Sequence, residues 1–273
     1  TWTVQSALNL GTPVNTIAES VFARAVSSSP ALRAAAQKAL AGPDGTIAVA
    51  DRDAFVEQIR QALWASKVVA YAQGLDEIRM AAEEYGWDIN VGEVAKIWRG
   101  GCIIRAKLLE RIRSEYAANQ LVTLLEAPSV AAGLADAQDA WREVVAVAVK
   151  AGIPVPGFAA AVAHYDQARA PRLNAALTQG MRDFFGSHTY RRIDSEGTFH
   201  TLWSGDRTEI RRHAVRRKRR TALTSGAENV GERGLMLGHD AGFAKPVAID
   251  EAVGSPFSLN LGRCATVACR VES

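Results

Sequence analysis

The sequence predicts an all-α fold, a compact bundle of several helices followed by a poorly ordered basic C-terminal tail. Apolar residues recur at three- and four-residue spacing in several segments, which is the period of an amphipathic helix, and proline or glycine often stands near the ends. Aromatic residues make up only 7% of the 273 residues and alanine is abundant, and both features favour helix over sheet. Strand patterns are nearly absent before residue 205.

The first two helices are expected in the N-terminal third of the chain. One begins at Thr12-Pro13, a capping residue followed by a proline at the first helical position. A longer helix runs from Asp51 or Asp53 to Tyr85 and ends at Gly86 in a left-handed cap, with Gly74 as a weak point inside it. The expected inward residues are Val14, Ile17, Val21 and Ala25 in the first helix, and Phe55, Ile59, Leu63, Val69 and Ala70 in the second.

The clearest helical pattern begins at Pro128 and ends before Gly152 and Pro154. A further helix ends at Gly186, and shorter ones fit residues 30–41, 91–98, 103–125 and 156–169. The expected inward stripes are Val130, Leu134, Ala137, Trp141, Val144, Val145 and Ala148 for the helix from Pro128, and Leu173, Leu177, Met181, Phe184 and Phe185 for the helix ending at Gly186.

The charge distribution separates a main body from a tail. Residues 207–220 hold eight Lys or Arg and one Glu, a charge of +7, so the net charge of +3 leaves 3 − 7 = −4 for the rest. Residues 221–273 have no sustained period. We therefore predict a helical domain over residues 1–205 and a disordered tail over residues 206–273. No aromatic residue interleaves the basic run, so nucleic-acid binding is the weaker interpretation and a solvated tail the stronger.

Cysteine usage and hydropathy bound the class of protein. Cys102, Cys264 and Cys269 are odd in number and form no CxxC pair, which indicates reduced thiols and predicts neither a disulfide framework nor a metal site. No apolar run approaches the roughly 18 residues of a membrane span. The first residues show no basic segment followed by an apolar one, so no signal peptide is predicted. We expect a cytoplasmic protein without a membrane partner.

Arg24 is the first candidate for a functional residue. It follows Ile17 by seven residues and Val21 by three, which places it at the edge of the first apolar stripe. A guanidinium there needs an anion or must extend its head to water. Two interpretations stay open: a snorkelling or structurally paired arginine, or a ligand for a phosphate or carboxylate group.

Arg182 and His188 form a second candidate site near the helix end at Gly186. An arginine on a helix beside a histidine in the following loop offers a bidentate anion donor and a group that titrates near neutral pH. Such pairs are also common as ordinary surface residues, and the residues alone do not decide between the two.

No phosphate-binding loop is evident. No GxGxxG follows a strand pattern and no Walker motif occurs, so the chain alone is expected to bind no dinucleotide. Gly100 and Gly101 interrupt a helical pattern, and we expect them to permit close helix packing. Cys102 beside them is expected to lie in the core as an inert residue.

Seven stretches resemble the C-terminal domain of the decarboxylating 6-phosphogluconate dehydrogenase family, in the family's order and at its spacing. Residues 210–273 do not share in the resemblance. Because seven collinear stretches agree, nearly all of residues 2–205 is identified as similar to that domain. The stretches are WTVQSAL (2–8), ESVFAR (19–24), SKVVAYAQG (66–74), EEYGWDINVGEVAKIWRGGCIIRA (83–106), AGIPVPGF (151–158), RDFFGSHTY (182–190) and FHTLW (199–203).

The resemblance implies an oxidoreductase of the pentose phosphate pathway. Its enzymes oxidise 6-phosphogluconate at C3 with NADP, decarboxylate the 3-keto intermediate and release ribulose 5-phosphate. By position, Arg24 corresponds to an arginine that binds the substrate phosphate. Arg182 and His188 correspond to an arginine and a histidine that one subunit of a homodimer donates to its neighbour's site.

The resemblance also implies what this chain lacks. The family's nucleotide-binding domain, its general-base lysine and its general-acid glutamate match positions upstream of Thr1. We therefore expect no catalytic residue and no NADP binding in this chain, and no turnover by it alone. The alternative hypothesis is a helical oligomerisation module without catalysis. Nucleic-acid binding through residues 207–220 ranks last.

Overall fold

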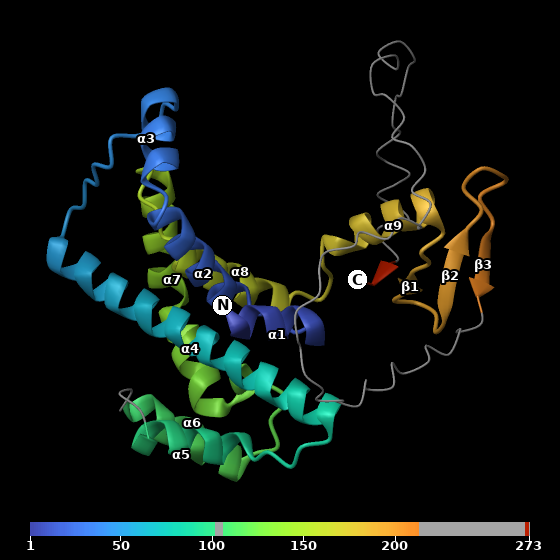
Figure 1. Ribbon diagram of the computed structural model, residues 1–273, viewed down its shortest axis with the longest axis horizontal. Coiled ribbons are helices and arrows are strands. Elements are labelled where there is room, and N and C mark those ends of the chain that lie inside the picture. The colour runs from blue at the N-terminus through green and yellow to red at the C-terminus, as the bar shows by residue number, and fades with distance from the viewer. Residues whose placement is uncertain (102–105, 213–270, 273) are drawn as a thin grey trace, which may run out of the picture. The chain divides into compact units, whose positions relative to one another are not determined.

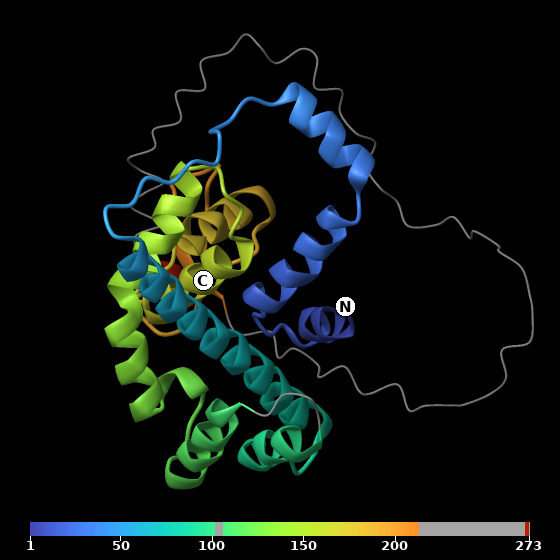
Figure 2. The same cartoon turned by 90° about the vertical axis from the view of Figure 1, so that its left-hand side faces the viewer.

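A computed structural model describes residues 1–101, 106–212 and 271–272 of the chain (Figures 1 and 2). The chain divides into two compact units, Thr1–Ala170 and Pro171–Ser273. The helices expected from the sequence are present in the described residues, so the all-α class is confirmed. The helices of the first unit are α1 (Trp2–Leu10), which the sequence did not predict, α2 (Asn15–Ser27), α3 (Pro30–Ala39), α4 (Arg52–Tyr85), α5 (Val91–Gly101), α6 (Lys107–Ala118), a short 3₁₀ turn η1 (Leu124–Glu126), α7 (Pro128–Lys150) and α8 (Pro156–Arg169).

The long helix α4 is the element against which α1, α2, α5, α7 and α8 pack. Its start is fixed locally, because the side chain of Asp51 accepts hydrogen bonds from the amides of Asp53 and Ala54, both at 3.0 Å. Its end is fixed by Gly86 at φ 69°, as expected, and Gly74 does not interrupt it.

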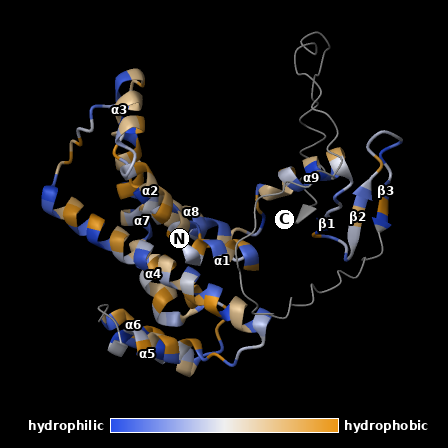
Figure 3. Cartoon of the chain, in the orientation of Figure 1, coloured by the Kyte–Doolittle hydropathy of each residue, from blue (hydrophilic) through white to orange (hydrophobic). Residues whose placement is uncertain are grey.

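The inward face predicted for α4 is partly wrong. Val69 is buried, but Ile59 and Leu63 are 38% and 54% exposed. The buried face is built largely from small residues, which allow α7 and α8 to approach closely, whereas the predicted stripe followed the large apolar side chains. Figure 3 shows apolar and polar segments alternating along α4. The fully buried small residues of α4 are Ala62, Ala65 and Ala72.

Helix α7 agrees with the sequence in both its start and its core face. It begins at Pro128, and Gly152 follows its end at φ 71°. Trp141 is fully buried and meets the ring of Tyr165 edge-on, with the ring centroids 5.9 Å apart. The other predicted inward residues that the structure buries are Val130, Leu134, Ala137, Val144 and Ala148.

Helix α2 begins later than predicted, and its cap comes from another helix. Thr12 is not the cap; the helix starts at Asn15. The amides of Thr16 and Ile17 donate to the side-chain oxygen of Gln73 on α4, at 3.0 and 3.4 Å. Gln73, 57 positions from Thr16, therefore accepts hydrogen bonds from amides that a capping residue next to the helix start usually satisfies. A pattern of neighbouring residues does not reveal such a distant cap. Helix α1 was not predicted.

The remaining expectations concern Gly100 and Gly101, the three cysteines and the absence of a membrane span. A β-carbon added to Gly100 or Gly101 would meet no described atom within 4 Å, so the close packing expected at these glycines is absent among the described residues. All three cysteines lie outside the described residues. Within the described residues, no helix is both long and apolar enough to cross a membrane.

The second unit consists, in its described residues, of one helix and short strands. Helix α9 (Ala175–Gly186) precedes β1 (Arg191–Arg192), β2 (Thr198–Thr201) and β3 (Glu209–Arg212), and β4 (Val271–Glu272) follows much later in the chain. β2 pairs with β3 in antiparallel register, Thr198 opposite Arg212 and Thr201 opposite Glu209, and β1 pairs with β4. Strands this short escape a prediction from periodicity.

The strand β3 lies in the segment that we predicted as a tail. Its residues pair with β2, which belongs to the predicted domain of residues 1–205, so the ordered structure extends past that boundary. The rest of the predicted tail, residues 213–270 and 273, lies outside the described residues, and so does most of the basic run.

The inward stripe predicted for α9 is wrong. The structure instead buries Ala176, Gly180 and Asp183, each one position before a predicted residue and so about 100° away around the helix. The large apolar side chains are exposed and leave an apolar face on this helix, which consists of Leu177 (43% exposed), Met181 (48%), Phe184 (53%) and Phe185 (77%).

Candidate functional site

Arg24 lies in the last turn of α2 and its side chain is exposed. Its backbone oxygen accepts hydrogen bonds from the hydroxyls of Ser27 and Ser28, at 2.7 and 3.0 Å. Among the described residues its guanidinium has no carboxylate within ion-pair distance. A structural ion pair therefore finds no support among the described residues, whereas an arginine that extends its head to water and a ligand for an anion both agree with the exposed side chain.

Arg182 and His188 both belong to the second unit, the first near the end of α9 and the second in the loop that follows it. Arg182 precedes the last turn of α9, is exposed, and donates to the side-chain oxygen of Gln179 at 3.0 Å. His188 is exposed in the loop that follows. Its ring lies over Gly186, where an added β-carbon would be 2.9 Å from the ring, so only glycine fits there without displacing the histidine.

The backbone around His188 is unusual. Ser187 and Thr189, on either side of it, have φ angles of 52° and 64°, in the left-handed region. This conformation is uncommon for residues other than glycine, and for a β-branched threonine it is a rare one. Two such residues in one loop persist only where the surroundings hold them. The loop is thus fixed by its contacts, and its conformation determines where His188 points.

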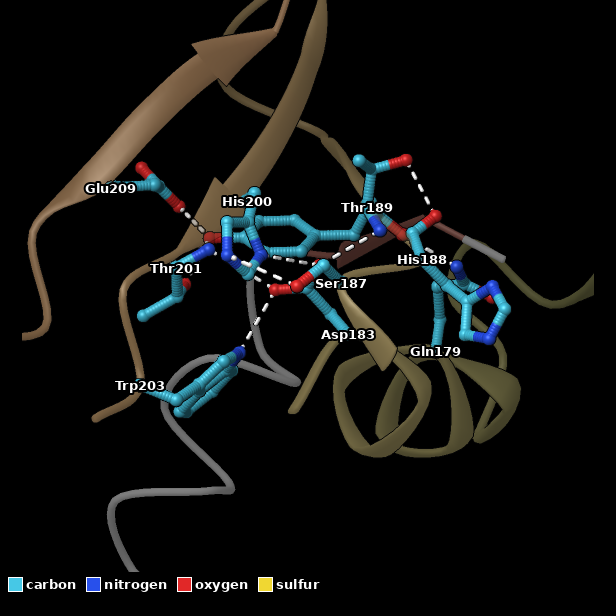
Figure 4. Close-up of polar contacts among 10 residues, drawn as sticks. Gln179, Asp183, Ser187, His188, Thr189, His200, Thr201, Trp203 and Glu209 are labelled. Carbon is cyan, nitrogen blue, oxygen red and sulfur yellow. Dashed lines mark hydrogen bonds and ion pairs between the residues drawn. The ribbon is translucent and has the colours of Figure 1, made fainter. Parts of the chain in front are cut away.

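Asp183 supplies most of those contacts, and the sequence did not single it out. Its side chain is fully buried. Oδ1 accepts from the amide of Thr189 at 2.7 Å and from Nδ1 of His200 at 2.9 Å. Oδ2 accepts from the amide of Thr201 at 3.1 Å and from Nε1 of Trp203 at 2.9 Å. Figure 4 shows the carboxylate between these donors, with the ring of His188 pointing away from it.

The hydrogen bonds keep this buried carboxyl ionised. Burial by itself raises the pKa of Asp183, but the donors from Thr201, His200, Trp203 and Thr189 outweigh burial, and the pKa is lowered. Because the ionised carboxylate can only accept, Nδ1 of His200 carries a proton. If the ring is neutral, its Nε2 then accepts from the hydroxyl of Ser187, which lies 3.4 Å away.

A second polar cluster joins β2 and β3 to Tyr190, the residue that directly follows Thr189. The hydroxyl of Tyr190 hydrogen-bonds with Oγ1 of Thr201 at 2.6 Å and with Glu209, and Glu209 also pairs with Arg192. Burial and the neighbouring Glu209 raise the pKa of Tyr190, so its hydroxyl stays protonated and donates. This cluster ties residues beyond 205 to the loop that carries His188.

The described residues offer no other assembled site of the kinds considered from the sequence. Three or more His, Cys, Asp or Glu side chains do not gather anywhere in them as metal ligands would. Arg24 belongs to the first unit, and Arg182 and His188 belong to the second. The strands described are antiparallel, and none leads through a glycine-rich turn into a helix as a dinucleotide site requires.

Comparison with known proteins gives a consistent answer for residues 1–203, which match the family described as 6-phosphogluconate dehydrogenase, C-terminal domain. Over 203 residues the chain is 55% identical to curated proteins named 6-phosphogluconate dehydrogenase, decarboxylating, from Shigella flexneri and from Escherichia coli strain K12. These similarities cover 74% of this chain and 43% of each relative, so the chain spans less than half the length of these curated relatives.

A solved structure is similar as well. It is that of Plasmodium falciparum 6-phosphogluconate dehydrogenase, described in its apo form and in complexes with its cofactor NADP+ and its substrate 6-phosphogluconate. The TM-score is 0.70 at 37% sequence identity, over 74% of this chain and 44% of that one.

Proposed function

Because this chain belongs to the 6-phosphogluconate dehydrogenase family, we propose that it is the substrate-binding and dimerising helical portion of an NADP-dependent, decarboxylating enzyme of that family. The proposed substrate is 6-phosphogluconate, the products are ribulose 5-phosphate and CO2, and the proposed location is the cytoplasm. Residues 1–205 carry this function and residues 206–273 do not. The observation that supports the proposal most directly is the exposed guanidinium of Arg24, which has no carboxylate partner among the described residues.

The three residues would act on the substrate through charge and hydrogen bonding. Arg24 binds the phosphate dianion, for which a guanidinium is the best-matched donor. Arg182 adds a second guanidinium, and His188 adds a donor whose charge can change near neutral pH. All three side chains are exposed, and this is compatible with direct contact to a ligand.

Titration of the full chain with 6-phosphogluconate, followed by calorimetry, tests the assignment of Arg24. Arg24→Ala is expected to weaken binding at least about tenfold, because a charge-assisted hydrogen bond contributes about 1.5–3 kcal/mol. Arg33→Ala is the matched control, since Arg33 is also exposed and has the same charge. Equal affinities of the two variants would contradict the role of Arg24.

A mixing experiment tests whether Arg182 and His188 act across a dimer. An Arg24→Ala chain and an Arg182→Ala/His188→Ala chain each lack part of every site as homodimers. Once subunits exchange, a mixed dimer regains one complete site only if Arg182 and His188 reach into the neighbouring subunit. Recovery of 6-phosphogluconate binding in the mixture is the expected result, and no recovery after verified exchange would show that all three act within one subunit.

The chain alone is proposed to have no turnover. The general-base lysine and general-acid glutamate of the family match no position in it, and the described residues form no dinucleotide site. Purified chain mixed with 6-phosphogluconate and NADP is therefore expected to produce no NADPH above background. Measurable NADPH formation, abolished by Arg24→Ala, would overturn this part of the proposal.

The exposed apolar face of α9 favours a second candidate, a helical oligomerisation module without substrate binding. A dimer in sedimentation velocity together with undetectable 6-phosphogluconate binding would select this candidate. A monomer would reject it.

A further inference from the structure

We infer that Asp183 is a positioning residue for the substrate site, because its buried carboxylate holds the loop that presents His188. This inference rests on the proposed function and names a residue that acts through others. Asp183 is fully buried, so it does not touch a ligand itself. Its negative charge would also repel a phosphorylated sugar acid, and a place away from the ligand is consistent with that.

The contacts of the carboxylate come from the loop that carries His188 and from β2 and the residues just after it. Thr189 is the residue directly after it in the loop, and its amide makes the shortest of the four hydrogen bonds at 2.7 Å. His200 and Thr201 come from β2, and Trp203 comes from just beyond β2. One carboxylate thus ties the end of α9, the loop and the strand together.

The backbone explains why the loop needs this anchor. Thr189 is β-branched and has φ 64°, a conformation that such residues rarely adopt without support. The backbone oxygen of Asp183 also accepts from the amide of Ser187 at 2.9 Å, which caps α9 at the other left-handed residue. Asp183 therefore holds both flanks of His188. Without its carboxylate, the loop is expected to relax and His188 to leave its place over Gly186.

The order Asp183, His200, Ser187 resembles that of a nucleophilic triad, but the geometry favours a role in positioning the loop. The hydroxyl of Ser187 lies 3.4 Å from Nε2 of His200, which is a long contact for proton transfer. The amide of Ser187 already donates to the backbone oxygen of Asp183, so it is not available to stabilise an oxyanion. His200 instead links Asp183 to the Ser187 side of the loop.

The test uses the full chain with Asp183→Asn, which keeps the shape of the side chain and removes its charge. Asp206→Asn is the matched control, since Asp206 lies in the same unit, is exposed and also accepts an amide hydrogen bond, from Thr208 at 2.9 Å. The ring resonance of His188, labelled with carbon-13 and assigned through His188→Gln, reports its surroundings without any ligand. The chain has five histidines, so the signals can be resolved.

Two results are expected for Asp183→Asn and not for Asp206→Asn. The His188 resonance shifts in the ligand-free chain, and 6-phosphogluconate binding weakens about ten- to a hundredfold. Adding His188→Ala to Asp183→Asn then weakens binding by less than His188→Ala does in the natural chain, because a displaced histidine contributes little. A residue with a purely structural role would give additive losses instead.

The outcomes separate this inference from the proposed function. If the natural chain binds no 6-phosphogluconate, the proposed function fails, while the His188 resonance still tests the positioning role. An unchanged His188 resonance in Asp183→Asn, or additive losses in binding, overturns the inference. Should Asp183→Asn unfold, Trp203→Phe removes one of the four donors and must show the same shift and non-additivity on a smaller scale.

Discussion

Two glycines, Gly133 on α7 facing α4 and Gly74 on α4 facing α2, give a prediction whose sign can be worked out from the structure. A β-carbon added at Gly133 on α7 would lie 2.5 Å from Cη2 of Trp64 and 3.2 Å from Cζ2 and Cζ3. At Gly74 on α4 the nearest atom would be Cδ1 of Ile17 at 3.8 Å, an ordinary contact. Gly133→Ala therefore forces the Trp64 ring to move by about 1 Å, whereas Gly74→Ala displaces nothing.

The magnitudes follow from two opposing contributions. Alanine in place of glycine inside a helix stabilises by roughly 0.5–1 kcal/mol in both variants. Overpacking at Gly133 costs about 1–3 kcal/mol in addition. We expect Gly74→Ala to raise the free energy of unfolding and Gly133→Ala to fall about 1–3 kcal/mol below it. The difference between the variants is the sharper quantity because the helix contribution cancels in it.

Urea unfolding followed by far-UV circular dichroism measures both variants, and equal slopes against urea are required for the comparison. Tryptophan fluorescence is unsuitable because Trp64 itself is perturbed. Trp64→Leu supplies the internal control: in that background, Gly133→Ala should recover most of its deficit relative to Gly74→Ala. The reasoning is refuted if Gly133→Ala stabilises as much as Gly74→Ala, or if its deficit is unchanged by Trp64→Leu.

Three further predictions concern single side chains. Asp51→Ala removes the cap of α4 and should lower the free energy of unfolding in urea by about 1 kcal/mol, whereas exposed Asp136→Ala should stay within about 0.5 kcal/mol; equal effects would contradict the capping role. Burial raises the pKa of Asp76 from 3.8 to about 6. The protonated side chain therefore leaves the free energy of unfolding at its highest below pH 3.8, and this stability is lost as the pH rises through about 6 and the buried carboxyl ionises. Between pH 4 and pH 8, the free energy of unfolding of Asp76→Asn in urea should therefore rise by about 1–2 kcal/mol relative to that of the natural chain, after allowance for partial exposure. A difference between the two chains that stays constant over this pH range would contradict the prediction. Tyr190→Phe leaves Thr201 without its hydroxyl partner and should speed amide exchange in β2, by about tenfold for a loss of about 1–1.5 kcal/mol; unchanged exchange would show that the cluster adds nothing.

The sequence predicts elements well where local signals decide them. Helix α7 has a proline at its start, a glycine after its end and large apolar residues at regular spacing, and the structure buries Val130, Leu134 and Trp141 as predicted. The start of α4 at Asp51 and its end at Gly86 are local as well. In each case the contacts that define the element lie within a few residues, so a pattern along the chain contains them.

The sequence fails where a distant contact decides. The start of α2 depends on Gln73, which is 57 residues away from Thr16. Asp183 was missed for the same reason, since its four side-chain donors lie 6 to 20 residues further along the chain. No spacing rule connects a helical aspartate to them. The local hint is limited to an acidic residue directly before two phenylalanines, Phe184 and Phe185.

The wrong inward face predicted for α9 has a physical reason that bears on function. Consecutive helical residues point about 100° apart, so Arg182, Asp183 and Phe184 face three directions. Asp183 faces inward to its donors, while Arg182 and Phe184 are exposed. A periodicity rule assumes that the apolar face covers the chain's own core, but the same pattern arises when that face covers a neighbouring subunit. Phe185 is 77% exposed and lies three positions after Arg182, on the same side of the helix. In the proposed dimer, a helix that buries Phe185 against a partner would also bring Arg182 to it, so substrate binding and dimerisation would depend on one element.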